Sequence, residues 1–207
     1  MIGIVCALRA EAPKLAAGAV VAVGGMGRAN AGRAAEALAA RHRLTGLIAA
    51  GFAGALTPDL RAGDVVIDTE VSAWRAAAER SGAALGRIAT VDRIIRTGAE
   101  RRALAASTGA LAVDMESDAV AEVARRHGLP FAAVRAITDT PQRDLVLDWN
   151  SYRRAHGGIR FLRLFLHVVR TPNGVEEIRQ LWYASRLASR RLGQFLGKLL
   201  GNDGHLS

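Results

Sequence analysis

Ala-Leu-Ala-Val-Asp-Met-Glu-Ser at residues 110–117 and Leu-Pro-Phe-Ala-Ala-Val-Arg-Ala-Ile-Thr-Asp at residues 129–139 are the two stretches that decide the fold. Each contains an apolar run suited to a buried strand, and a carboxylate follows each run, Glu116 in the first and Asp139 in the second. An open parallel sheet binds ligands in the crevice beyond the carboxyl ends of its strands. We therefore expect both carboxylates to point into one pocket, as they would in an enzyme.

Strand and helix signals alternate along the chain around these two stretches. Apolar runs typical of strands occur at 2–7, 19–24, 47–50, 64–67, 86–91 and 131–137. Helical spacing of apolar residues occurs at 28–42, 99–106 and 118–127. This alternation predicts an α/β fold, a three-layer sandwich around a mixed but mostly parallel central sheet.

The last quarter of the chain carries most of the positive charge. Residues 151–201 hold ten basic and two acidic side chains, so they account for +8 of the formal net charge of +9. We predict a catalytic domain over 1–150 and a basic, amphipathic helical extension over 151–207 that packs on or beside it. Two interpretations of the apolar and basic runs at 159–169 and 175–200 stay open: peripheral contact with an anionic membrane, or a helix that covers the sheet or a dimer partner. Nucleic-acid binding is disfavoured, because apolar positions outnumber those that track phosphates.

Composition excludes several other classes of protein. The 207 residues suffice for one compact core, and the single cysteine, Cys6, lies in an apolar run where a buried thiol is expected. No secretory leader and no charge-free run of about 18 residues is visible, so we predict a cytoplasmic protein. The five histidines lack metal-ligand spacing and no Gly-x-Ser-x-Gly motif occurs, so we predict no metal, no cofactor and no serine hydrolase.

Four segments in the same order resemble the purine nucleoside phosphorylase and nucleosidase superfamily, and its methylthioadenosine/S-adenosylhomocysteine nucleosidase branch in particular. They are Ile-Gly-Ile-Val-Cys-Ala-Leu-Arg-Ala-Glu (2–11), Gly-Phe-Ala-Gly-Ala-Leu (51–56) with Arg-Ala-Gly-Asp-Val-Val-Ile (61–67), Val-Asp-Met-Glu-Ser (113–117) and Val-Arg-Ala-Ile-Thr-Asp (134–139). A finer resemblance is to the hopanoid-associated members, short chains with an Arg-rich C-terminal helix. The resemblance implies a phosphorylase/hydrolase-like fold, a homodimer, and removal of adenine from a 5′-substituted adenosine, adenosylhopane in the hopanoid-associated members.

The resemblance also implies roles for four residues. Asp139 matches the acid that protonates adenine at N7, Glu116 the residue that binds the ribose hydroxyls, and Glu11 the carboxylate that orients the attacking water. Met115 would lie under the sugar. The alternatives are a helix cap before Pro141 for Asp139 and a solvated charge at a helix start for Glu11.

Ile94 and Ile95 are the candidates for contact with the base. In the nucleosidases the equivalent stretch supplies an aromatic ring and backbone groups to adenine. Ile94 falls where that ring would lie, which weakens stacking, and core packing is the alternative for both residues.

Water is favoured over phosphate as the nucleophile. Phosphorylases hold phosphate with Arg and a hydroxyl around their Gly-rich turn, because guanidinium forks and backbone donors bind phosphate best. At that turn, which includes Gly51, this chain has Ala49 and Phe52 instead. Because Arg28 lies beside Gly27, a phosphorylase stays an alternative, although a solvated helix residue is the simpler account of Arg28.

The stretch between Glu11 and Gly25 is short, whereas the nucleosidases usually have an extra hairpin there. We expect the pocket to be more open on that side, which suits a bulky apolar 5′ substituent on a small-molecule or lipid-linked adenine nucleoside. The rival from another class is a non-catalytic, membrane-associated scaffold. Glu11, Glu116 and Asp139 together argue against such a loss of activity.

Overall fold

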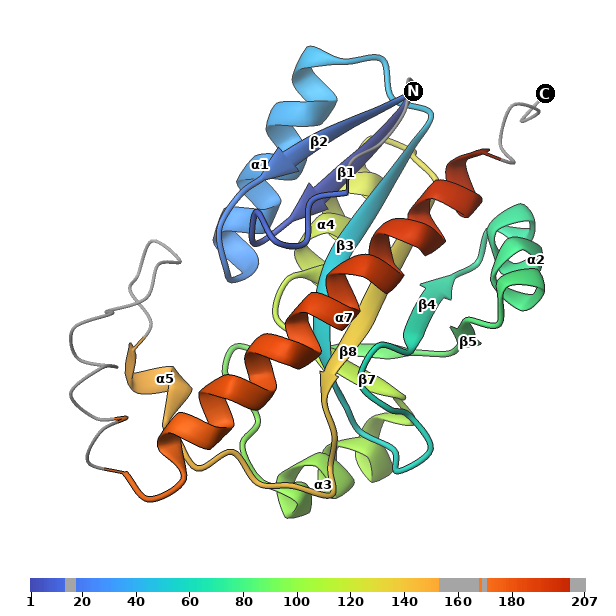
Figure 1. Ribbon diagram of the computed structural model, residues 1–207. Helices are drawn as coiled ribbons and strands as arrows, with labels where there is room; N and C mark the ends of the chain where they lie inside the picture. The colour runs from blue at the N-terminus through green and yellow to red at the C-terminus, as the bar shows by residue number, and fades with distance from the viewer. Residues whose placement is uncertain (14–17, 153–167, 169–170, 202–207) are drawn as a thin grey trace.

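The computed structural model describes residues 1–13, 18–152, 168 and 171–201. Its elements, labelled in Figure 1, follow in chain order. They are β1 (Ile2–Cys6), β2 (Ala19–Val23), α1 (Arg28–Arg41), β3 (Gly46–Ala55), β4 (Val65–Thr69), α2 (Ser72–Ser81), β5 (Ala84–Leu85), β6 (Ile88–Thr90), α3 (Gly98–Thr108), β7 (Ala112–Asp114), α4 (Ser117–Arg126), β8 (Phe131–Asp139), α5 (Trp149–Tyr152) and α7 (Gly174–Gly201).

The strands form one mixed sheet in the order β2-β1-β3-β8-β4-β5, and β7 pairs with both β3 and β6 beside this path. Most neighbours are parallel, and the pairs β3 with β7 and β4 with β8 are antiparallel. The predicted α/β class with a mixed, mostly parallel sheet is confirmed. The central strands β3 and β8 are nearly continuous apolar runs because both of their faces are covered.

A β-bulge interrupts the central pair just where the predicted acid lies. Ala53 pairs with Ile137, but Gly54 pairs with Asp139, so Thr138 is the extra residue on β8. Bulges bend a strand and redirect its side chains, and they are frequent beside functional sites. Here the bulge sets the direction in which Asp139 leaves the sheet.

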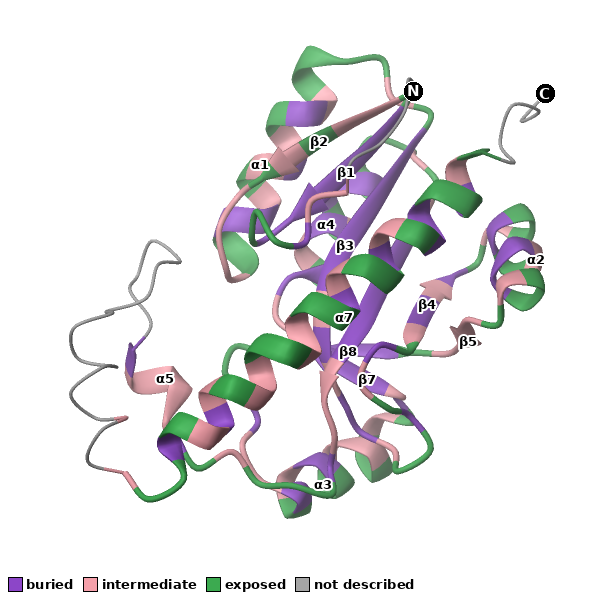
Figure 2. Cartoon of the chain, in the orientation of Figure 1, coloured by how far each residue is buried: buried purple, intermediate pink, exposed green. Residues whose placement is uncertain are grey.

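Helices cover both faces of the sheet, which gives the three predicted layers. On one face α1 and α4 pack together over β1 and β3, and on the other α7 runs obliquely across β3 and β8 with α2 beside it (Figure 1). Purple, buried positions are concentrated on the central strands and on the inward sides of these helices (Figure 2). No described helix is long and apolar enough to cross a membrane.

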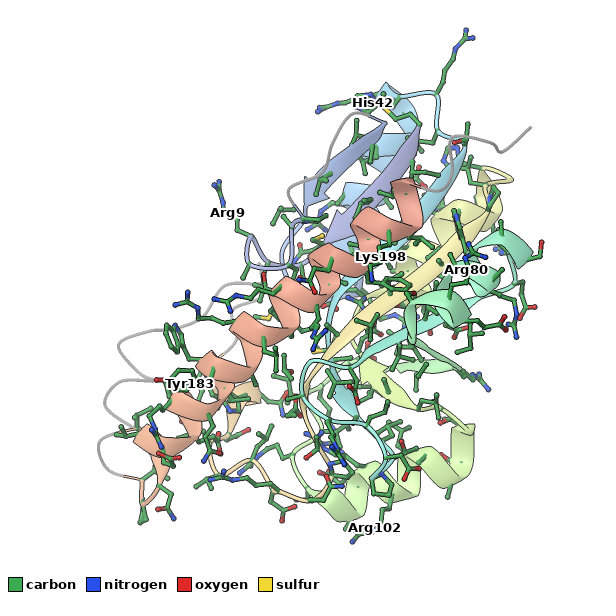
Figure 3. The ribbon with its side chains drawn as sticks, turned by 45° about the vertical axis from the view of Figure 1, so that its right-hand side comes forward. Arg9, His42, Arg80, Arg102, Tyr183 and Lys198 are labelled. Carbon is green, nitrogen blue, oxygen red and sulfur yellow. The ribbon has the colours of Figure 1, made fainter. Side chains whose placement is uncertain are left out.

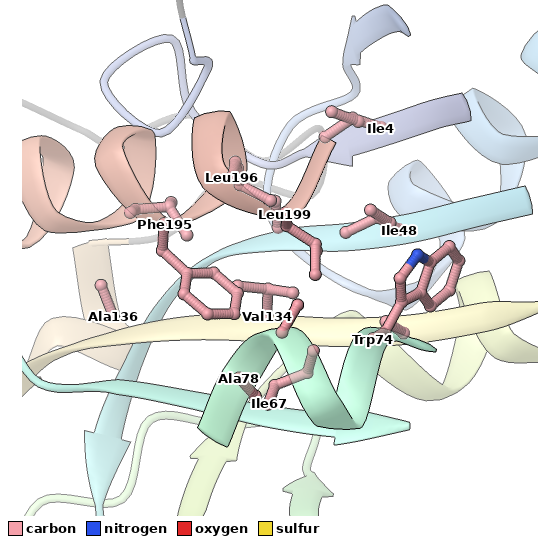
Figure 4. Packing of buried hydrophobic residues seen from close by; sticks show 14 of the residues in the cluster. Ile4, Ile48, Ile67, Trp74, Ala78, Val134, Ala136, Phe195, Leu196 and Leu199 are labelled. Atoms are coloured by element: carbon pink, nitrogen blue, oxygen red, sulfur yellow. The ribbon is translucent and has the colours of Figure 1, made fainter. Parts of the chain in front are cut away.

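The helix predicted within 175–200 is present as α7, but its apolar residues do not form a single free face. Phe195, Leu196 and Leu199 point toward Ile48 and Val134 of the sheet, as Figure 4 shows. This part of α7 therefore covers the sheet, which is one of the two interpretations left open for it. The predicted boundary at 150/151 stays a prediction, and 159–167 and 169 of the other apolar run lie outside the described residues.

Candidate active site

A cavity of about 360 Å³ lies beyond the carboxyl ends of β3, β7 and β8. It is lined by seven of the ten residues that the sequence singles out: Glu11, Phe52, Ile94, Ile95, Met115, Glu116 and Asp139. The cavity is where the topology of an open α/β sheet predicts a ligand. The other three, Gly27, Arg28 and Gly51, lie outside its lining.

Glu11 is buried, at 6% relative exposure, and is not a solvated charge. Its Oε2 accepts hydrogen bonds from the backbone N–H groups of Ala7 (2.9 Å) and Leu8 (2.8 Å), and its Oε1 accepts from the N–H of Phe52 (3.0 Å). Burial raises the pKa of Glu11, and the nearby Arg135 guanidinium and the N–H groups of Leu8 and Phe52 oppose the rise. A fixed carboxylate with a raised pKa is suited to accept a proton near neutral pH.

Glu116 is also buried, and its Oε1 accepts a hydrogen bond from the N–H of Gly27 at 2.8 Å. Gly27 has φ +96°, a conformation that favours glycine, so it acts by holding Glu116 from outside the cavity. Burial raises the pKa of Glu116 too, against the opposing charge of Arg135. The two carboxylates thus share one cation.

Arg135 lies under the cavity floor and is 1% exposed. It pairs with the fully buried Asp114, donates to Ser117 Oγ at 3.0 Å, and its Nη2 lies 3.9 Å from Glu116 Oε2. Gly51 leaves space for this network, because a Cβ there would clash with the guanidinium and lie 3.0 Å from Glu11 Oε1. Gly51 therefore serves the site sterically, and sequence reasoning had assigned no role to Arg135.

Asp139 is engaged through both of its carboxylate oxygens. Oδ2 forms an ion pair with Arg101 of α3, and Oδ1 accepts a hydrogen bond from Thr138 Oγ at 2.8 Å. The side chain is 21% exposed and reaches the cavity. Sequence reasoning missed Arg101 as well, because nothing in its local pattern distinguishes it from its exposed neighbour Arg102.

The 94–95 segment lines the cavity, but side chains from elsewhere already bind its backbone. Asn150 accepts from the N–H of Ile94 (2.8 Å) and donates to its carbonyl (3.0 Å), while Arg101 Nη2 donates to the carbonyl of Ile95 (3.0 Å). Ile95 also packs in a small core cluster with Ala89 and neighbouring residues. Ile95 therefore lines the cavity and also packs in the core, and its contact with the base stays a prediction.

Arg28 lies at the surface with its side chain 45% exposed, and forms ion pairs with Asp118 (3.5 Å) and Asp92 (4.0 Å). Arg28 is therefore placed as a solvated helix residue, the simpler of its two accounts.

One wall of the cavity is apolar and consists of Leu145, Trp149 and Leu181. Sequence reasoning missed this wall.

Trp149 is held in that wall by the buried carboxylate of Glu177 on α7. The indole Nε1 donates to Glu177 Oε1 at 2.8 Å, and the N–H groups of Val146 and Leu147 bond to the same carboxylate. The start of α7 therefore fixes the loop that follows β8. The connection expected to leave the pocket open includes residues 14–17, which lie outside the described residues.

Comparisons with known proteins show which proteins this chain is similar to. A family model described as the phosphorylase superfamily matches residues 9–81 and 68–155. Two 5′-methylthioadenosine/S-adenosylhomocysteine nucleosidases are among the relatives. The one from Shewanella piezotolerans is 25% identical over 168 residues, which are 64% of this chain and 73% of the relative. The one from Geobacillus thermodenitrificans is 31% identical over 156 residues, 58% and 66%.

Solved structures share the fold at low sequence identity. The futalosine hydrolase of Helicobacter pylori superposes with a TM-score of 0.70 at 16% identity, covering 97% of both chains. A methylthioadenosine/S-adenosylhomocysteine nucleosidase from Colwellia psychrerythraea, solved in complex with adenine, has a TM-score of 0.69 at 17% identity, covering 97% of this chain and 94% of that one. At such identities these structures establish the fold alone.

Proposed function

Because this chain belongs to the phosphorylase superfamily, we propose that it cleaves the N-ribosidic bond of a 5′-substituted adenosine and releases adenine. The observation that carries the proposal is that Glu11, Glu116 and Asp139, which come from three separate segments, meet in one cavity. Its relatives are nucleosidases, and the chain is an N-glycosyl hydrolase of the purine nucleosidase type.

The site supplies a group for each charge that the reaction creates. When the bond breaks, its electrons move to the base and positive charge develops on the ribose. Asp139 gives a proton to N7 of the base, and Glu11 takes a proton from the water whose oxygen bonds to C1′. Glu116 accepts hydrogen bonds from the ribose hydroxyls, above Met115. The raised pKa of Glu11 suits it to the role of base.

Water is the proposed nucleophile. Ala49 is buried and Phe52 offers a backbone N–H to Glu11 instead of a hydroxyl to phosphate. Arg28 forms its ion pairs outside the cavity lining. These observations favour a hydrolase over a phosphorylase.

We further propose that the 5′ substituent is large and apolar, with adenosylhopane as the specific candidate. The apolar wall of Leu145, Trp149 and Leu181 supports this choice, because an apolar wall stabilises a ligand surface that leaves water. A short thioether would fill less of that wall.

Adenine release from 5′-substituted adenosines, measured with and without phosphate, tests the proposed reaction. We expect release without phosphate, and a kcat/KM that rises from methylthioadenosine to substrates with long apolar 5′ groups. Strict dependence on phosphate would make the protein a phosphorylase, and a preference for methylthioadenosine would exclude the long substituent. Binding of adenine without any release would favour the scaffold.

The outward face of α7 supports a second proposal, that this cytoplasmic enzyme docks peripherally on an anionic membrane. Trp182 and Tyr183 are 51% and 58% exposed, and Arg186 lies 4.8 Å from the centroid of the Trp182 ring. Tyr183 projects from α7 in Figure 3. The exposed cations of α7 are Arg179, Arg186, Arg190, Arg191 and Lys198, of which Arg179 is paired with the partly exposed Glu176 at 2.8 Å. Basic and aromatic side chains together suit an anionic lipid interface.

Assembly into a homodimer, which the resemblance implies, stays a prediction.

Replacing Arg186 and Arg190 together by Gln is expected to weaken binding to vesicles that contain anionic phospholipid by about thirtyfold, at about 1 kcal/mol for each cation near the surface. Vesicle sedimentation measures the affinity. The matched control is the double variant Arg80→Gln and Arg102→Gln, which removes the same charge from exposed positions on α2 and α3, labelled in Figure 3. Equal binding by the two double variants would exclude α7 as the docking face.

A further inference from the structure

Arg101 is an unusual residue for a surface helix, because its side chain is 1% exposed. Arg is almost never fully buried unless it is paired. It lies in the first turn of α3, which begins with a capping box in which Thr97 and Glu100 bond reciprocally, while Asp144 accepts from the N–H of Gly98 at 2.7 Å. The helix start is therefore fixed, and so is the point from which Arg101 enters the protein.

The guanidinium of Arg101 joins three segments around the cavity. Nη2 bonds to the carboxylate of Asp139 and to the carbonyl of Ile95 (3.0 Å). Nη1 bonds to the carbonyl of Ala55 at the end of β3 (3.3 Å) and to that of Asp139 (3.4 Å). The planar guanidinium thus fixes the distance between Asp139, the predicted acid, and the segment at Ile95, which is expected to contact the base.

Gly54 is the residue that leaves room for this pair. A Cβ at Gly54 would lie 2.8 Å from Arg101 Nη1 and 3.0 Å from Asp139 Oδ2. Any larger side chain would push the guanidinium or the carboxylate aside. Gly54 is also the residue at which the β3–β8 register shifts, so bulge, glycine and buried arginine form one arrangement.

We infer that Arg101 is a positioning residue for the proposed reaction: it orients the Asp139 carboxyl toward the base and stabilises the carboxylate that proton transfer leaves behind. This inference rests on the proposed function. In the transfer, the O–H bond of Asp139 breaks, an N–H bond forms at N7 of the base, and the electron pair of the O–H bond stays on the carboxylate. The ion pair in the structure is the arrangement that this carboxylate then adopts.

A comparison of two leaving groups distinguishes a role of Arg101 in proton transfer from a purely structural role. Adenine needs a proton to depart, whereas 4-nitrophenolate leaves as a stable anion without one. A residue that acts through the acid therefore matters for an adenine substrate and not for a 4-nitrophenyl riboside with the same 5′ group. A residue that only supports the fold would affect both substrates alike.

The experiment compares Arg101→Met, Arg101→Lys and Gly54→Ala with the control Arg102→Met, which changes an exposed neighbour on the same helix. For adenine release, Arg101→Met should lower kcat by about a hundredfold with KM nearly unchanged, because small misplacements of a catalytic group cost about that much. Arg101→Lys should recover part of the loss, because a point charge replaces the fork. Gly54→Ala should show the same selective loss without removing any charge.

Cleavage of the 4-nitrophenyl riboside should stay at the wild-type rate in all four variants. A parallel loss on both substrates, or full adenine release by Arg101→Met, would overturn the inference and leave the proposed function standing. Failure of the wild type to release adenine would instead overturn the proposed function. Gly54→Ala and Arg101→Lys keep the test decisive if Arg101→Met does not fold.

Discussion

An Asp139→Asn variant should lose adenine release by about 10² to 10⁴-fold, the usual contribution of a positioned acid. The amide has nearly the same size as the carboxyl, but it has one acceptor oxygen, so it can keep the hydrogen bond from Thr138 or the one from Arg101 and not both. It cannot give a proton to the base. Because the cavity and its apolar wall are unchanged, the loss should fall on kcat and not on KM. Initial rates of adenine release, with KM for the same nucleoside, measure the effect.

The matched control for this variant is Asp59→Asn, the same substitution at an exposed turn position. It should release adenine at the wild-type rate. Cleavage of a 4-nitrophenyl riboside by Asp139→Asn should be nearly normal, because that leaving group needs no proton. Wild-type adenine release by Asp139→Asn would show that the proton comes from elsewhere, and the assignment of Asp139 as the acid would then be wrong.

The central strands could be predicted from the sequence because strands buried on both faces consist of continuous apolar runs. β1, β3 and β8 are such runs, and Asp139 at the end of β8 could be assigned to the carboxyl edge of the sheet by topology alone. Glu116 follows β7, which pairs antiparallel with β3, so the rule for parallel strands does not by itself place Glu116 at that edge. No such local signal marks α2, where no element was predicted. Its buried Trp74 packs in the same core as α7, which is a hundred residues away in the chain.

The buried arginines could not be predicted for a related reason. The chain has 28 basic residues, and the ordinary expectation for each is a solvated side chain. Arg101 and Arg135 are exceptions because distant segments close over them, and only the tertiary structure shows which segments do so. Helical spacing likewise predicted a helix within 175–200, but the pattern alone does not separate the exposed Trp182 from Phe195, which packs on the sheet.

Replacing Arg135 by Met should be the most destabilising single change at the site. Arg135 is the cation that faces Asp114, Glu116 and Glu11, all of which are buried. Removing one partner of a buried ionic network costs about 3–5 kcal/mol, because the remaining charges lose their compensation. For a chain of this size that lowers Tm by on the order of 10 °C. Thermal unfolding at pH 7 to 8 measures it.

The loss of Tm in Arg135→Met should become smaller as the pH falls. This pH dependence distinguishes unbalanced charge from lost packing as the cause of the loss. Burial raises the pKa of Glu11 and Glu116 in the folded protein, and Arg135 opposes the rise. A carboxyl whose pKa is higher in the folded state contributes stability that is fully present below its unfolded pKa, about 4.3 for Glu. That stability is lost as the pH rises through the folded pKa. Without Arg135 the folded pKa values rise further, so Arg135→Met should approach the wild-type Tm toward about pH 4.5, near that unfolded value.

The control for this comparison is Arg125→Met, which removes an exposed guanidinium from α4 and should change Tm little at any pH. A deficit in Arg135→Met that stayed constant from pH 8 to pH 5 would mean that lost packing, not unbalanced charge, destabilises the variant. A deficit that closes on acidification would mean that the cavity floor holds more negative charge than it can keep without Arg135. Such a floor is suited to a reaction that builds positive charge on the sugar above it, because the same carboxylates stabilise that charge as it forms.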